Sequence, residues 1–178
     1  MPVQPVQATA LLTEGDRLEA GETFEVLLLP GHADGHIVLL GLETGRLLGG
    51  DVLLAEITPN VGRWEDTAHD PLGRYLETLA RVERLAPPVV YPGHGPVITD
   101  APGRAREIAR HHEERLVATQ RALERGAATA YDVACSLWPD ERGLHEQRFA
   151  LVESISHLER LCVEGRARET SPGRFEPL

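Results

Sequence analysis

Short apolar runs separated by glycine-rich turns fill the first half of the chain. Apolar residues dominate 23–29, 37–42, 46–48 and 88–91, and each run is shorter than a typical helix. We therefore predict a β-strand in each of these ranges, with a hairpin turn at Thr44-Gly45 between the second and the third. Weaker strands are expected at 8–12 and 17–18.

The remaining stretches carry apolar residues at helical spacing. Asp70-Pro71 predicts the start of a helix that ends before Pro87-Pro88, and Thr99-Asp100 predicts the start of a longer helix over 101–125. Two more helices are expected over 129–138 and 145–163, the first opened by a capping box at Thr129 and Asp132. A short hairpin over 166–176 follows them, and two helices followed by a hairpin indicate a winged helix.

Length and composition bound the fold class. The chain has 178 residues, 42% of them hydrophobic, which is enough for one ordinary domain or one and a half small ones. We predict an α+β fold with a first domain at 1–105 and a winged-helix domain at 106–178. Cys135 and Cys162 fall on apolar sides of predicted helices, so we expect buried thiols rather than a disulfide or a metal clamp.

Charge and hydropathy exclude some function classes. The net charge of −10 argues against a general attraction to nucleic acid or to an anionic membrane. No apolar run approaches the roughly 20 residues that cross a bilayer, and no basic-then-apolar signal opens the chain. These features predict a soluble cytoplasmic protein without a membrane partner.

Candidate chemistry lies where three predicted strands end. One strand runs into Pro30-Gly31-His32-Ala33-Asp34-Gly35-His36, another into Gly49-Gly50-Asp51, and a third into Pro92-Gly93-His94-Gly95-Pro96. Any one of these residues alone is more often a loop or capping residue. Because the same pattern recurs three times, we predict that His32, Asp51 and His94 are metal ligands, and imidazole with carboxylate suits Zn²⁺.

Three other histidines receive different predictions. His36 is expected to brace the loop rather than to bind metal directly. Neighbours on a helix point about 100° apart, so His111 and His112 cannot chelate one ion together. We predict a solvated helix face for that pair, although His112 also falls in a thin apolar stripe with Ile108 and Leu116.

The order of these motifs resembles the metallo-β-lactamase superfamily, in the branch of glyoxalase-II-like hydrolases with a winged-helix tail. Ile57-Thr58-Pro59-Asn60 is a fourth motif in the expected order. The resemblance implies the second half of an αββα sandwich and two zinc ions. It makes His32 a ligand of the first zinc, Asp51 the bridge between both, and His94 a ligand of the second. Such enzymes hydrolyse esters, thioesters, amides or phosphodiesters.

The chain departs from that family at one motif above all. The His-x-His-x-Asp-His segment, which supplies four further ligands, is absent, and no histidine precedes His32. We therefore expect a truncated hydrolase that binds zinc weakly or not at all. The sequence indicates no catalytic side chain beyond the metal ligands. The sheet would then have an exposed apolar face, which a complementing N-terminal half or a second copy of the chain would cover. The residues predicted on that face are Val26, Leu28, Val38, Leu40, Leu48 and Val90.

A second function class remains open, which is a non-catalytic winged-helix module that binds nucleic acid or another partner, or an inactive gene fragment. Its basic residues would be Arg160, Arg166, Arg168 and Arg174. Four acidic residues accompany them and favour a packing or substrate-pocket role instead, namely Glu153, Glu159, Glu164 and Glu169.

Overall fold

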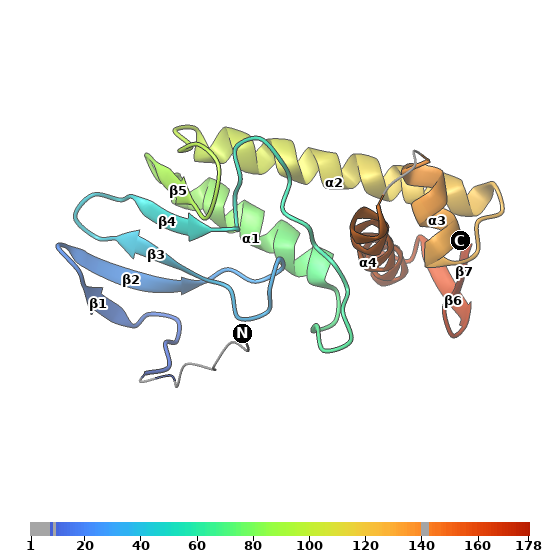
Figure 1. The fold of residues 1–178 in the computed structure, drawn as a ribbon, viewed down its shortest axis with the longest axis horizontal. Helices are drawn as coiled ribbons and strands as arrows, with labels where there is room; N and C mark the ends of the chain where they lie inside the picture. Colours follow the sequence, from blue (N-terminus) through green and yellow to red (C-terminus); the bar gives the residue numbers. More distant parts are fainter. Residues whose placement is uncertain (1–7, 9, 140–142) are drawn as a thin grey trace.

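A five-stranded sheet carries the candidate residues in the computed structural model, which describes residues 8, 10–139 and 143–178 (Figure 1). The strands are β1 (Arg17–Glu19), β2 (Thr23–Leu28), β3 (Ile37–Gly41), β4 (Leu47–Gly50) and β5 (Val90–Pro92), and they lie in this order across the sheet. The predicted strands at 17–18, 23–29, 37–42, 46–48 and 88–91 are confirmed. The strand expected at 8–12 is wrong for 8 and 10–12, and residue 9 lies outside the described residues.

Strand direction explains why the candidate loops meet. β2 pairs antiparallel with β3, β3 pairs antiparallel with β4, and β4 pairs parallel with β5. β2, β4 and β5 therefore run the same way, so their carboxyl ends lie at one edge of the sheet. Every chain segment that carries a candidate ligand leaves the sheet at that edge.

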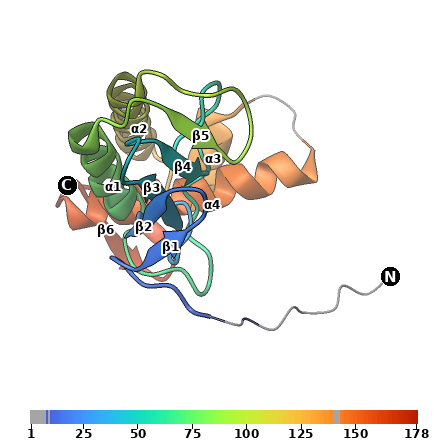
Figure 2. The same cartoon turned by 90° about the vertical axis from the view of Figure 1, so that its left-hand side faces the viewer.

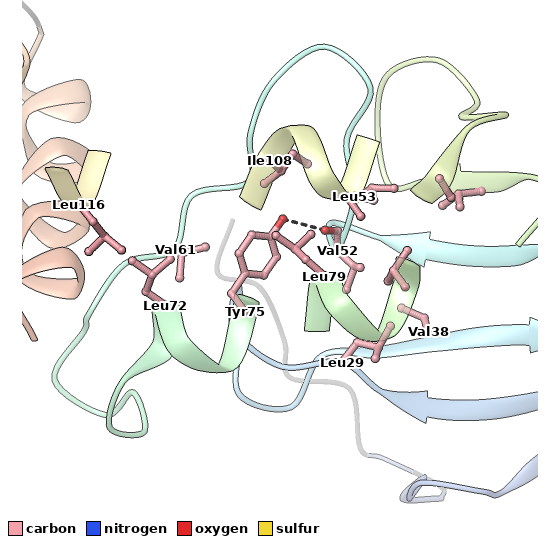
Figure 3. Close-up of a cluster of buried hydrophobic side chains, with 14 of the residues drawn as sticks. Leu29, Val38, Val52, Leu53, Val61, Leu72, Tyr75, Leu79, Ile108 and Leu116 are labelled. Carbon is pink, nitrogen blue, oxygen red and sulfur yellow. Dashed lines mark hydrogen bonds between the residues drawn. The ribbon is translucent and has the colours of Figure 1, made fainter. Parts of the chain in front are cut away.

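One face of the sheet packs against α1 (Pro71–Leu85) and α2 (Ala101–Glu124), which lie together on one side of the strands in Figure 2. The register pairs Leu27 with Val38 and Leu47 with Val90, so all four side chains point to this face. They belong to the same buried cluster as Tyr75 and its neighbours in Figure 3. Each large apolar side chain buried there contributes about 1.5–3 kcal/mol.

The opposite face, which we call the open face, is less covered. Leu28, Leu48 and Tyr91 are 38%, 37% and 42% exposed there. The six residues predicted to share the uncovered face do not all lie on it. Successive side chains of a strand point to opposite faces, and the pairing between strands places three of the six on each face. Leu28 and Leu48 lie exposed on the open face, and Val26 points to the same face but is fully buried. Val38, Leu40 and Val90 point toward the helices.

The C-terminal part contains α3 (Ala130–Leu137), α4 (Leu144–Val163), β6 (Ala167–Ser171) and β7 (Arg174–Pro177). The capping box at Thr129 and Asp132 is confirmed. The order of helix, helix and hairpin is the predicted one, and the α+β class is confirmed. α2 contacts α1, α3, α4 and β7. The domain boundary predicted at 105/106 lies within α2. Among the described helices, none is both long and apolar enough to cross a membrane.

Burial in this part differs from the prediction for both cysteines. Cys135 is exposed and Cys162 is only partly buried, and both are free thiols. The short helix α3 buries only Val133 and Ala134, because it lies at the surface of the protein. On α4, polar side chains are buried alongside apolar ones, and His157 is among them.

Asp70 joins the start of α1 to α4 and offers a first test of the fold. Its Oδ1 accepts the Gly73 N–H at 2.9 Å, and its Oδ2 accepts from Arg160 Nη1 at 2.8 Å. We expect Asp70→Ala to lower the free energy of unfolding by about 2 kcal/mol, since it removes both a helix cap and a partly buried ion pair. Asp70→Asn retains the cap and should cost about half as much. Urea denaturation of both variants measures the difference, and equal losses would contradict the assigned roles.

Candidate functional site

Two histidines flank one carboxylate at the carboxyl edge of the sheet. His32 follows β2, Asp51 follows β4 and His94 follows β5. His32 Nε2 lies 3.8 Å from Asp51 Oδ2, and His94 Nε2 lies 3.4 Å from Asp51 Oδ1. All three side chains are partly exposed to solvent. The structure thus places together the three residues that the sequence singles out, and their donor atoms are of the kinds that zinc takes.

The turn after β5 lies so close to Asp51 that a side chain at residue 93 would displace the carboxylate. The Gly93 N–H donates to the Gly50 carbonyl at 2.7 Å. A Cβ at residue 93 would lie only 2.6 Å from Asp51 Oδ1. Glycine therefore lets the loop that carries His94 lie directly beside the carboxylate.

The orientation of His32 is fixed by a backbone carbonyl. Its Nδ1 lies 2.9 Å from the carbonyl oxygen of Asn60. A carbonyl can only accept, so Nδ1 carries the proton and Nε2 presents its lone pair toward Asp51. This is the arrangement of an imidazole that binds a metal, in which the other nitrogen donates to a carbonyl or a carboxylate.

His36 holds the backbone of Asp51 in place. The Asp51 backbone N–H donates to His36 Nε2 at 3.2 Å, so this nitrogen is already used as an acceptor. Burial, assisted by neighbouring His32, lowers the pKa of His36 and keeps the imidazole neutral. The geometry is that of a bracing residue, as the sequence predicts.

The loop from Asp51 to Trp64 is held by α2. Arg104 donates through Nε to the Leu54 carbonyl at 2.7 Å and through Nη2 to the Ile57 carbonyl at 2.8 Å. The sequence predicts a loop beside the site but gives no sign of this clamp, because Arg104 is one of many arginines on α2. A hollow of about 400 Å³ opens next to His32 and is lined by Ala33, Asp34, Trp64, Glu65, Asp66 and Thr67.

A second group of metal-binding side chains lies inside the protein, where α2 meets α4. One ligand atom each of His112, Glu153 and His157 lies within 4.8 Å of the others. His112 and His157 are fully buried, and their ring centroids are 5.6 Å apart. The prediction of a solvated face is therefore wrong for His112, because it lies in the stripe with Ile108 and Leu116 that packs inward.

Burial controls protonation in this interior cluster. Desolvation, assisted by His157, lowers the pKa of His112 to about 3, and desolvation lowers the pKa of His157 to about 4. Desolvation also raises the pKa of Glu153 to about 7, against the opposing charge of Arg115. Both imidazoles are therefore neutral at pH 7.

Sequence patterns alone did not single out Glu153 and His157 as site candidates. The available signal was their spacing, since residues four apart on a helix lie on one face. They fall among apolar residues of α4, and the pairing partner on α2 is 41 or more positions away. Only the packing of α2 against α4 brings the three together.

Asn60 connects the two groups. Its carbonyl accepts from His32 at the sheet edge, while its side-chain Nδ2 donates to Glu153 Oε2 at 3.2 Å. A single residue of the loop therefore contacts both the open site and the interior cluster.

Comparison with known proteins identifies two family regions. Residues 4–94 match the model described as "Metallo-beta-lactamase superfamily", and residues 116–175 match "Metallo-beta-lactamase-like, C-terminal domain". The protein named "Probable metallo-hydrolase YqjP" from Bacillus subtilis is 33% identical over 162 residues, which cover 88% of this chain and 50% of YqjP. "Lactamase-like protein aptB" from Emericella nidulans is 33% identical over 108 residues, covering 61% of this chain and 32% of that protein.

Solved structures extend the similarity to the whole fold. The metallo-beta-lactamase family protein TTHA1429 from Thermus thermophilus is 38% identical with a TM-score of 0.87, over 98% of this chain and 56% of that one. A beta-lactamase domain protein from Burkholderia ambifaria is 29% identical with a TM-score of 0.84, over 94% of this chain and 52% of that one. The chain spans half or less of the length of the two curated relatives, and slightly more than half of the two solved chains.

Proposed function

The chain belongs to the metallo-β-lactamase superfamily, and we propose that it contributes part of a zinc-dependent hydrolytic site. The substrate class is an ester, thioester, amide or phosphodiester. The observation that supports this proposal is the approach of two imidazole nitrogens to the two oxygens of Asp51. Neutral imidazole and carboxylate are preferred zinc ligands, and the open position of the three residues leaves room for water and substrate.

The three residues would take separate roles at such a centre. His32 would hold one metal ion, His94 a second, and Asp51 would bridge them. Bound zinc supplies Lewis acidity and a nucleophilic water at neutral pH. His36 holds the backbone of Asp51, and the Asn60 carbonyl holds the ring of His32, so the ligand set is oriented before any metal arrives.

Three ligands are too few for two catalytic zinc ions. A catalytic zinc usually has three protein ligands and an open position. We propose that a segment with the His-x-His-x-Asp-His motif completes the centre, either in the same polypeptide or in a partner. The open face, where Leu28, Leu48 and Tyr91 are exposed, is where we place that segment's contact.

Reconstitution tests this function. The 178-residue chain would be mixed with a separately expressed segment that carries the His-x-His-x-Asp-His motif, and zinc content and hydrolysis of p-nitrophenyl, thioester and bis-p-nitrophenyl phosphate substrates would be measured. We expect the chain alone to bind zinc only weakly at the sheet edge and to hydrolyse none of them, and the mixture to bind about two zinc ions more than the chain alone and to turn over at least one. A mixture that forms a complex but binds no more zinc than the chain alone and hydrolyses no substrate would refute the proposal.

The alternative of a nucleic-acid-binding module has less support. Its candidate arginines are largely paired, since Arg166 contacts Glu113 and Glu164, and Arg168 contacts Glu176. Arg160 likewise contacts Asp70 and Glu164. Salt-sensitive binding of single-stranded RNA that survives His32→Ala and Asp51→Ala would favour the module over the hydrolase.

A further inference from the structure

We propose that His112, Glu153 and His157 form a second, interior metal site that takes a zinc ion and joins α2 to α4. This site is separate from the one at the sheet edge and does not depend on the proposed hydrolytic function. The three ligand atoms come from two helices and lie within 4.8 Å of one another. Two imidazoles with one carboxylate are a known zinc ligand set.

Unpaired nitrogens inside the protein are the main argument. Neither Nδ1 nor Nε2 of His112 has a hydrogen-bond partner within the described part of the chain, although the side chain is fully buried. His157 Nε2 is also buried without a partner there. Leaving a buried polar group unpaired costs free energy. A neutral imidazole has one N–H and one lone pair, so an ion would pair one nitrogen of each histidine and lower that cost.

The second nitrogen of His157 supports a ligand role. His157 Nδ1 lies 2.8 Å from the backbone carbonyl of Glu153, so Nδ1 carries the proton and Nε2 has a free lone pair. Glu153 is supported in turn, since its Oε2 accepts from Asn60 Nδ2. Metal ligands are commonly held by outer hydrogen bonds of this kind.

Helix geometry makes the site compact. Glu153 and His157 are four residues apart on α4, so both face α2 across the helix interface. Tyr75 of α1 closes one side, with its ring 5.6 Å from that of His112 and nearly perpendicular to it. Ligands on a tetrahedral zinc lie about 3.4 Å apart, so small side-chain rotations would bring the three ligand atoms to one ion and leave one position open.

Zinc binding by a variant without the edge site tests the proposal. In the 178-residue chain with His32→Ala and His94→Ala, zinc content after dialysis and the melting temperature with and without zinc would be measured. We expect one zinc per chain, and a melting temperature about 5–10 °C higher at zinc concentrations about 100-fold above the dissociation constant. His157→Gln on this background should abolish both effects, whereas the exposed His145→Ala on the same helix should change neither.

A second variant guards against a folding defect in the first. Glu153→Gln retains an oxygen for the Asn60 amide but removes the charged ligand, and should weaken zinc binding by at least about tenfold while circular dichroism stays unchanged. The proposal is overturned if the background variant takes up no zinc. It is equally overturned if folded Glu153→Gln and His157→Gln retain the zinc and the shift in melting temperature.

Discussion

Gly31→Ala is expected to lower the free energy of unfolding by about 3–4 kcal/mol. Gly31 lies in the loop before His32 with a φ of +130°, a conformation that L-residues rarely adopt. A Cβ there would lie 2.4 Å from Tyr75 Cβ and 2.5 Å from Tyr75 Cα. Because α1 presents its backbone at this point, the clash cannot be relieved by rotating a side chain.

Gly35→Ala in the same loop is the matched control. No atom lies within 4 Å of a Cβ at that position, and its φ is not in the left-handed region. We expect a change of less than about 1 kcal/mol, with stabilisation as the favoured direction, because alanine restricts the unfolded chain. Urea denaturation compares the two variants, and equal midpoints would show that the loop does not rest on α1 as described.

Asp51→Asn is expected to lower hydrolysis by the reconstituted protein at least about 100-fold, which corresponds to about 2.7 kcal/mol of lost transition-state stabilisation. The amide preserves the shape of the carboxylate but removes the charge that both histidines face. Because the side chain is partly exposed, the unfolding midpoint should change little. The loss of rate therefore reports on the site rather than on the fold.

Glu56→Gln provides the control for this charge change. Glu56 is exposed on the same loop that follows β4. The substitution removes one negative charge near the site without touching the three converging residues, and we expect the rate to stay within about twofold. If Asp51→Asn reduced hydrolysis no more than Glu56→Gln, Asp51 would not be a metal ligand.

Local sequence patterns predicted most elements of the fold. Glycine, proline and capping residues mark their ends, as Asp70 does for α1 and Thr129 for α3. The same glycine-broken strand ends also predicted which three side chains meet at the sheet edge. These signals are local, because each depends on residues next to one another in the chain.

Long-range packing could not be read in the same way. Val38 and Val90 were predicted on the uncovered face of the sheet but point toward the helices. The register between the strands decides which alternate side chains face the helices. The interior cluster was missed because His112 and His157 meet only through the crossing of α2 and α4. The spacing of apolar residues predicted a buried Cys135, but the face of α3 that carries Cys135 is exposed to solvent.

Anomalous diffraction at the zinc edge from crystals of the reconstituted complex tests the central claim most directly. We expect anomalous peaks within about 2.0–2.2 Å of His32 Nε2, of His94 Nε2 and of an Asp51 carboxylate oxygen. Peaks confined to other parts of the molecule, with Asp51 free of metal in a complex that hydrolyses its substrate, would contradict the account.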